Sequence, residues 1–158
     1  MPPLHPNAQA VADRLAALEV AGQVHMFSER VATAAQAAER LGVSIGAIAN
    51  SLVFDGDGRP FLILASGAHR VDTDKCAALL GVQRLRRATP EFVRAATGQP
   101  IGGVAPVGHP QPLPTLVDVA LRQYETVWAA AGHPNASFPT TFDELLRITH
   151  GTATEVAG

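Results

Sequence analysis

Two apolar segments separated by a turn form the clearest hydrophobic pattern in the chain. Ala49 to Phe54 is apolar and rich in β-branched residues, and Pro60 to Ala65 is apolar again. Asp55 to Gly58, between them, consists only of Asp and Gly, the residues that favour tight turns. The pattern predicts an antiparallel β-hairpin at this point in the chain.

Apolar residues at spacings of three and four predict a first helix from about Ala8 to Ala21. Asn7 is its expected N-cap and Gly22 its expected end. Other segments combine a capping residue with a following apolar pattern and, in most cases, a closing glycine. These helices are expected at about Thr33 to Gly42, Asp72 to Gly81, Thr89 to Gly98 and Thr141 to Ile148.

Shorter apolar segments are expected to form the remaining strands, at Gln23 to Ser28, Gln83 to Arg87, Thr115 to Val119, Thr126 to Ala131 and Ala136 to Pro139. Strands and helices are interleaved irregularly around a hairpin, which favours an α+β fold over a doubly wound parallel sheet. The 158 residues are expected to form a single domain, residues 1–158.

The segment Gln99 to Pro110 differs from the rest, with three glycines, three prolines and a histidine in twelve residues. Glycine permits a positive φ and the close approach of a ligand, and proline fixes φ. A stiff loop of this kind can direct main-chain N–H groups at an anion or a developing oxyanion. A rigid connector between two strands is the alternative. His109, near the end of the loop, can contact a substrate or satisfy a loop carbonyl.

The net charge of −2 provides no global field that attracts nucleic acid, so any contact with RNA must be local. The local candidates are Arg70, Arg84, Arg86 and Arg87, and the alternative is a solvated strand face.

No apolar segment reaches the roughly 18 residues that span a bilayer, so no membrane partner is expected. The N-terminus lacks the pattern of a secretory signal, and one cysteine excludes an internal disulfide. A cytoplasmic location is therefore expected.

The sequence has none of the motifs of several common enzyme classes: no P-loop, no G-x-S-x-G elbow and no dinucleotide-binding glycine pattern after a strand. The six histidines are scattered without metal-ligand spacing, so neither a metal nor another cofactor is expected. Cys76 precedes the apolar residues Ala77 to Leu80. It is interpreted as a small buried residue, and a catalytic nucleophile is the alternative.

The Gly–Pro loop carries a Gly-x-x-x-Pro element at Gly102 to Pro106, within Ile101 to His109. Its order and spacing relative to several other motifs resemble the YbaK/ProX family of aminoacyl-tRNA deacylases, over roughly Thr33 to Thr149. Those other motifs are Ser51 to Phe54, Gly67 to Asp72, Ala88 to Glu91, Thr97 with Gly98, and Val127 to Gly132.

The resemblance implies a mixed, β-barrel-like sheet surrounded by helices. It also implies a free-standing trans-editing enzyme that hydrolyses the ester of a mischarged tRNA, with proline tRNA carrying a small wrong amino acid as the expected substrate. The implied partners are the 3′ end of aminoacyl-tRNA and prolyl-tRNA synthetase. Because such an ester is already activated, main-chain groups of Gly102 and Gly103 could suffice to stabilise the oxyanion. The other expected substrate-binding residues are Pro106, His109, Arg70 and His69.

One position departs from the family pattern. The residue before Ser-Leu-Val-Phe is typically a lysine in that family, and here it is Asn50. Asparagine can donate and accept hydrogen bonds but carries no charge. We expect Asn50 to contribute to catalysis through substrate contact. The alternative is a weak or inactive homologue that binds an aminoacyl-adenosine or the tRNA 3′ end.

Overall fold

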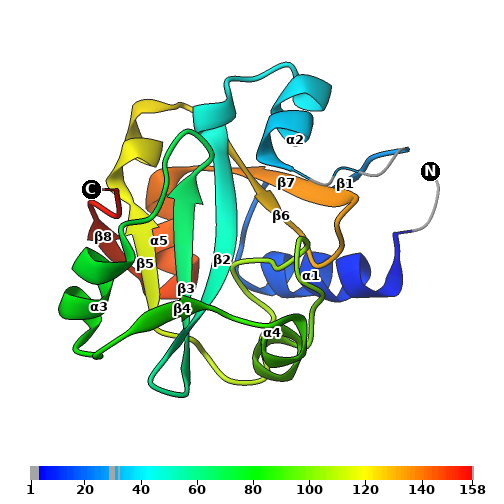
Figure 1. Cartoon of the computed structure of the whole chain (residues 1–158). Helices are drawn as coiled ribbons and strands as arrows, with labels where there is room; N and C mark the ends of the chain where they lie inside the picture. Colours follow the sequence, from blue (N-terminus) through cyan, green and yellow to red (C-terminus); the bar gives the residue numbers. More distant parts are fainter. Residues whose placement is uncertain (1–3, 29–30, 32, 158) are drawn as a thin grey trace.

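A computed structural model describes residues 4–28, 31 and 33–157 (Figure 1). Its helices are α1 (Pro6–Ala17), α2 (Ala34–Leu41), η1 (Ile45–Ala47), α3 (Thr73–Leu80), α4 (Pro90–Thr97), η2 (Val119–Gln123) and α5 (Phe142–Thr149). Its strands are β1 (His25–Met26), β2 (Ile48–Gly56), β3 (Arg59–Ser66), β4 (Leu85–Arg87), β5 (Thr115–Asp118), β6 (Val127–Ala130), β7 (Ala136–Thr140) and β8 (Thr152–Thr154).

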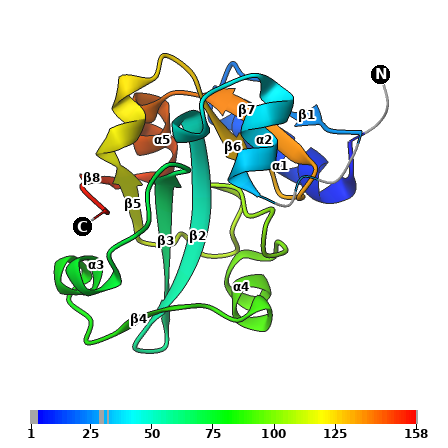
Figure 2. The same ribbon diagram turned by 45° about the horizontal axis from the view of Figure 1, so that its top comes forward.

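The strands of the described chain form one mixed sheet in the order β1-β7-β6-β2-β3-β5-β8, and β4 pairs with β2 outside this path. The predicted hairpin is confirmed: β2 and β3 pair antiparallel from Ala49 with Ser66 to Gly56 with Arg59. The pairs β2–β6, β3–β5 and β5–β8 are parallel. Figures 1 and 2 show helices around this sheet. The expected α+β class, with its mixed, barrel-like sheet, is confirmed.

Strand β2 has two different neighbours along the edge that faces away from β3. Ile48 and Ala49 pair with β6, whereas Phe54 to Gly56 pair with β4. Between these pairings the two neighbouring strands diverge, and Asn50 to Val53 have no strand partner on that edge within the described pairings. This opening in the sheet positions the site described below.

Strand β3 of the hairpin is buried on both faces, because it separates two apolar clusters. Leu62 and Leu64 join the larger cluster, with residues of α1, α4, α5 and the Gly–Pro loop. Phe61 and Ile63 point into the second cluster, with residues of α3 and β4. Alternation along the strand sends successive side chains to opposite faces. The hairpin is therefore held from both sides and gives the site a rigid floor.

Four of the five predicted N-caps are confirmed. The side chains of Thr33, Asp72, Thr89 and Thr141 each accept a hydrogen bond from the backbone N–H three residues later. Each such bond satisfies an N–H group that the helix itself leaves without a partner.

The predicted limits of the first helix are wrong at both ends. His5, not Asn7, is the N-cap, and its Nδ1 accepts a hydrogen bond from the Asn7 N–H at 3.1 Å. Pro6 fits the first turn because it needs no N–H partner there. The helix ends at Ala17, and Glu19 takes a positive φ of 60°. Gly22 is instead packed against the backbone of Pro139, where a Cβ would collide.

Two strand predictions also need correction. The strand expected at Gln23 to Ser28 reduces to His25–Met26, which pairs with β7. The pattern did not indicate β8, which pairs in parallel with β5. Both strands are too short to show a periodic apolar pattern, and partners distant in sequence define them.

Candidate functional site

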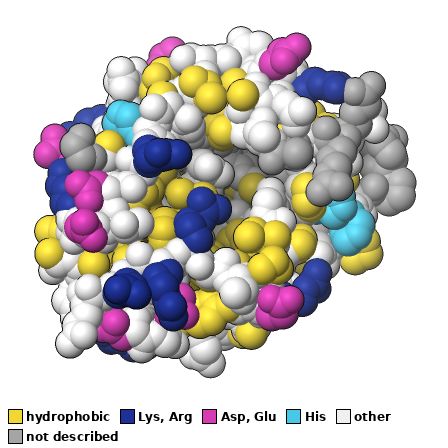
Figure 3. Space-filling view, viewed as in Figure 1, with side chains coloured by type: hydrophobic (Ala, Val, Ile, Leu, Met, Phe, Trp, Pro, Cys, Tyr) yellow, Lys and Arg dark blue, Asp and Glu magenta, His cyan; other side chains and the backbone are white. Residues whose placement is uncertain are grey.

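A cavity of about 800 Å³ opens where β6 and β4 diverge from β2. It is lined by residues from β2, α2, the turn after β3, the Gly–Pro loop and β6–β7. Figure 3 shows a hollow on this face, with Lys and Arg side chains beside it. Four of the predicted site residues line the cavity: Asn50, His69, Arg70 and Gly102. Gly103, Pro106 and His109 do not belong to its lining.

Asn50 and Ser51 lie on the open edge of β2 and both line the cavity. Asn50 is exposed, so its amide can reach a ligand. The Ser51 Oγ is inaccessible to solvent and has no hydrogen-bond partner among the described residues. A buried hydroxyl without a hydrogen-bond partner is energetically costly. In the sequence, Ser51 is visible only as part of the Ser51 to Phe54 motif, which indicates no role for its side chain.

Gly102 occupies the bend of a tight turn. The Gly103 N–H donates to the Pro100 carbonyl at 3.0 Å, and Gly102 has φ of +87°, the geometry that a type II turn requires at its third position. A Cβ on Gly102 would meet no atom within 4 Å. On Gly103 it would lie 2.6 Å from the His133 backbone. Gly102 thus faces open space, whereas Gly103 is packed against the chain.

Several other residues of the Gly–Pro loop pack into the core. Val104, Ala105 and Val107 belong to the larger apolar cluster. The buried Gln99 side chain accepts from the Ala105 N–H at 2.7 Å and donates to the Val107 carbonyl at 3.1 Å. His109 makes a hydrogen bond of 2.8 Å from Nε2 to the Ala105 carbonyl. This is the loop-satisfying contact that the sequence analysis named as its alternative.

His69 lies in the turn that follows β3. Its Nδ1 is 2.9 Å from Oδ2 of Asp118, a residue that is 1% exposed. The same Oδ2 accepts from the Ser66 N–H at 3.0 Å, and Oδ1 accepts from the Ala120 N–H at 2.9 Å. Sequence reasoning missed Asp118, because the only sign was a carboxylate at the end of a predicted strand.

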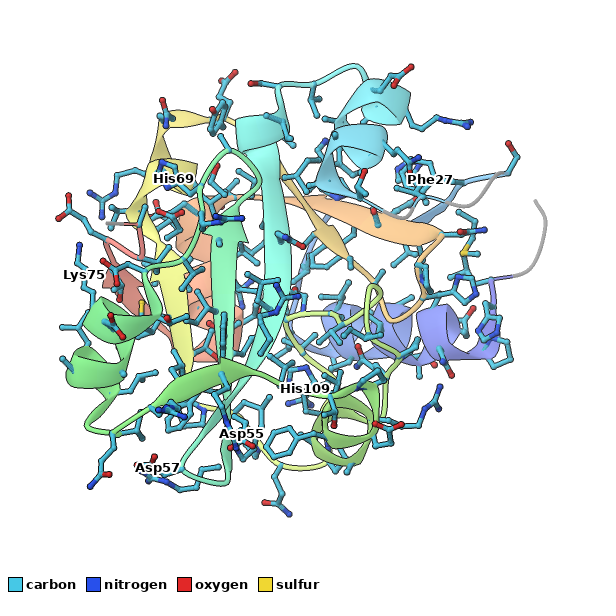
Figure 4. The ribbon with its side chains drawn as sticks, in the orientation of Figure 1. Phe27, Asp55, Asp57, His69, Lys75 and His109 are labelled. Carbon is cyan, nitrogen blue, oxygen red and sulfur yellow. The ribbon has the colours of Figure 1, made fainter. Side chains whose placement is uncertain are left out.

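The cations at the site are arginines. Arg70 and Arg87 line the cavity, and the Arg87 guanidinium lies 5.9 Å from the centre of the Phe54 ring. Lys75 lies elsewhere, on α3, where Nζ donates to the Ala157 carbonyl at 3.2 Å (Figure 4). Lys75 therefore does not replace the lysine that the family carries at position 50.

Cys76 is not placed to act as a catalytic thiolate. Cys76 is fully buried in the second apolar cluster, and burial raises the pKa of its thiol, with the nearby Asp72 carboxylate adding to the effect. A raised pKa disfavours the thiolate that a nucleophile needs.

Across residues 4–28, 31 and 33–157, no group of three or more His, Cys, Asp or Glu side chains is arranged to hold a metal ion. No helix in the described part of the chain is long and apolar enough to cross a membrane.

The chain belongs to the aminoacyl-tRNA editing domain family, whose family model matches residues 28–148. This confirms the resemblance stated above. Among solved structures, one described as a "putative trans-editing enzyme for prolyl tRNA synthetase" superposes with a TM-score of 0.93 and 41% identity, covering 99% of both chains.

Curated relatives extend the comparison. The chain is similar to "Uncharacterized protein YwhH" of Bacillus subtilis (strain 168), with 38% identity over 75% of this chain and 76% of that protein. It is also similar to "Putative Cys-tRNA(Pro)/Cys-tRNA(Cys) deacylase EbsC" of Enterococcus faecalis, with 27% identity over 82% and 80%. A Proline--tRNA ligase of Nitratidesulfovibrio vulgaris (strain DP4) matches 43% of this chain at 43% identity. That stretch is 12% of the ligase.

Proposed function

We propose that this protein is a free-standing deacylase that hydrolyses the ester of a mischarged aminoacyl-tRNA. The observation that carries the proposal is a cavity whose lining includes Asn50, His69, Arg70 and Gly102, at the opening of the sheet. Proline tRNA carrying a small wrong amino acid is the proposed substrate. The similarity to the structure described as a "putative trans-editing enzyme for prolyl tRNA synthetase" supports the choice of proline tRNA.

The chemistry requires a positioned water and donors for the oxyanion, because the ester is already activated. The Gly103 N–H already donates within the turn, so the proposal assigns the oxyanion contact to the main chain of Gly102. Gly103 then supports this contact by letting the loop pack against His133. Pro106 and His109 hold the loop from inside and contribute to binding indirectly.

The tRNA 3′ end is proposed to enter beside the two arginines. Phosphate groups pair well with guanidinium, which presents several donors in one plane. Arg70 and Arg87 both line the cavity, which supports a contact between them and the terminal phosphates. Asn50, which is exposed in the cavity, would then contact the aminoacyl ester.

Asn50 favours a second candidate function. With asparagine where the family pattern has lysine, the protein could bind the aminoacylated 3′ end without hydrolysing it. Losing a cation beside a developing negative charge costs about 2–4 kcal/mol of transition-state stabilisation when the group acts as an oxyanion donor.

A deacylation screen distinguishes the two functions. Proline tRNA and other tRNAs would be charged with alanine, serine, threonine or cysteine and incubated with the natural protein. The leading proposal expects hydrolysis of at least one of these substrates. Absence of hydrolysis, combined with measurable affinity for a non-hydrolysable aminoacyl-adenosine analogue, would support the binding function instead.

Substitution of Asn50 sharpens the result. Asn50→Ala should lower activity, and Asn50→Lys should raise it by about tenfold if about 1.4 kcal/mol of transition-state stabilisation is restored. Asn7→Lys adds the same charge on α1, outside the cavity lining, and should leave activity unchanged. Hydrolysis that is indifferent to both Asn50 variants would remove this residue from the mechanism.

A further inference from the structure

We propose that His69 is the general base of this site and that Asp118 is its positioning residue. The inference rests on the proposed deacylase function and assigns the group that removes a proton from the attacking water. It follows from the hydrogen bonds around the turn after β3, which no motif in the sequence indicates.

Asp118 is a carboxylate buried inside the protein and fully engaged there. It is the last residue of β5, and it accepts the Ser66 and Ala120 N–H groups in addition to the contact with His69. A buried carboxylate with several donors holds its orientation, and so it can hold a histidine ring in turn. The side chain of His69 is 37% exposed, against 1% for Asp118.

This contact determines which ring nitrogen carries the proton. A carboxylate accepts hydrogen bonds, so the Nδ1 of His69 is the donor and Nε2 keeps its lone pair in the neutral ring. The His69 side chain is 37% exposed and belongs to the cavity lining, so the proposal has Nε2 meet a water molecule there.

The turn that carries His69 is fixed from several directions. The Ser66 Oγ donates to the Gly46 carbonyl at 2.8 Å, and the Gly67 N–H donates to the Ile48 carbonyl at 2.8 Å. A Cβ on Gly67 would lie 2.5 Å from the Ile45 carbonyl oxygen. The His69 N–H donates back to the Ser66 carbonyl at 2.9 Å. A general base needs such a fixed position to contribute fully.

The neighbouring charged groups have partners or face the cavity. Asp118 approaches from β5, and Arg70 follows His69 and lines the cavity. The Asp72 carboxylate caps α3, and the Lys75 ammonium donates to the Ala157 carbonyl. Arg70, next to the proposed base, would bind a substrate phosphate while Nε2 accepts a proton from the water.

The proposed step conserves atoms and protons. Nε2 accepts a proton from water as the water oxygen bonds to the ester carbonyl carbon, giving a tetrahedral intermediate whose oxyanion meets the Gly102 main chain. The bond from this carbon to the ribose oxygen then breaks. The protonated ring returns its proton to that oxygen, and the products are the free amino acid and tRNA.

The test measures single-turnover deacylation as a function of pH for the natural protein and for His69→Ala. General base catalysis contributes about 10²- to 10⁴-fold, and we expect a loss within this range. Activity of the natural protein should depend on pH through this base, and His69→Ala should lack that dependence. Added imidazole should restore part of the activity. His150→Asn is the matched control: it changes an exposed histidine that ends α5 with a positive φ, and should behave as the natural protein does.

Asp118→Asn tests the positioning role. An amide can donate to Nδ1, which would move the ring proton to Nε2 and remove the base, so activity should fall about 10- to 100-fold. Its pH profile should change even if its melting temperature does not. If Asp118→Asn fails to fold, His69→Ala with imidazole rescue still tests whether His69 is the general base.

The outcomes separate this inference from the proposed function. If the natural protein hydrolyses the substrate and His69→Ala does so as well, with the same pH profile, His69 is not the general base. The deacylase function then remains intact. Loss of activity without a change in pH dependence and without imidazole rescue also overturns the general base. Absence of hydrolysis by the natural protein on every charged tRNA overturns both proposals.

Discussion

The Gly–Pro loop and the turn after β3 border the same cavity, but they are held in different ways. The side-chain hydrogen bonds that Gln99 makes within the loop at 99–110 are local, to Ala105 and Val107, six and eight positions away. The turn at 66–70 is fixed by distant residues: Asp118 is 52 positions from Ser66 and 49 from His69. A local device shapes one side of the cavity, and a tertiary contact shapes the other.

The difference has a consequence for each side. The Gln99 hydrogen bonds of the loop lie within one short segment of the sequence. This loop offers main-chain groups at Gly102. The turn depends on the packing of β3 against β5, which brings a buried carboxylate to a histidine. Substitutions in the Gly–Pro loop and in the turn after β3 change the two sides of the cavity separately, so their effects can be compared.

The largest effect is expected for Gln99→Leu, which keeps the volume of the side chain but removes both of its hydrogen bonds. The Ala105 N–H and the Val107 carbonyl would each lose a partner. A buried group left unpaired costs about 1–3 kcal/mol, so the free energy of unfolding should fall by about 2–6 kcal/mol. Chemical denaturation measures this change. The exposed Gln123→Leu serves as the control and should change stability by less than about 0.5 kcal/mol. Equal losses in the two variants would show that Gln99 does not hold the loop.

The next effect is on activity, for Gly102→Ala. A Cβ there projects into open space at the cavity and forces alanine into a φ of +87°. We expect a loss of about 10²-fold in deacylation, the scale of one oxyanion donor. Gly58→Ala is a close control, because Gly58 also has φ of +87° and open space but lies in the β2–β3 turn, outside the cavity lining. Both variants should lose similar stability, measured by thermal unfolding, and only Gly102→Ala should lose activity. Parallel losses of activity would mean that strain alone explains the effect.

A smaller effect is expected on the other side of the cavity, for Ser66→Ala. Its hydroxyl donates to the Gly46 carbonyl and accepts from the Ala68 N–H. Removing it should lower the free energy of unfolding by about 1–2 kcal/mol and speed hydrogen exchange at the His69 amide. Ser44→Ala is the comparison, since Ser44 is exposed and makes no capping hydrogen bond with its side chain. If exchange at His69 does not respond, the turn is fixed by its other contacts.

The smallest effect is a pH dependence within the Gly–Pro loop. Burial lowers the pKa of His109 from its ordinary value of 6.5, although its bond to the Ala105 carbonyl opposes the shift. The unfolded chain therefore binds a proton more readily than the folded one, and stability falls as the pH drops below about 6.5. His109→Gln should reduce the loss of stability between pH 7 and pH 5. The pKa of His133 is also lowered, by burial and then by His5, so part of the loss should remain. If His109→Gln and the natural protein lose the same stability between pH 7 and pH 5, a group other than His109 causes the pH dependence.

Local signals in the sequence determined much of the fold. The β2–β3 hairpin and the caps at Thr33, Asp72, Thr89 and Thr141 depend on neighbouring residues, so turn chemistry and capping residues predicted them. The first helix shows where such reasoning fails. Asn7 and Gly22 have the right residue types, but Pro6 with His5 begins the helix and Glu19 follows its end.

By itself, the sequence also pointed to the family and to the Gly–Pro loop, because glycine and proline act on the backbone where they stand. Only the tertiary structure decided which face of that loop meets the cavity. It placed Gly102 there and turned His109 inward to the Ala105 carbonyl. The contact between His69 and Asp118 likewise forms only when β5 aligns with β3, because the two residues are 49 positions apart. Pairing over such a distance depends on the strand order of the whole sheet, and no local pattern of residues encodes it.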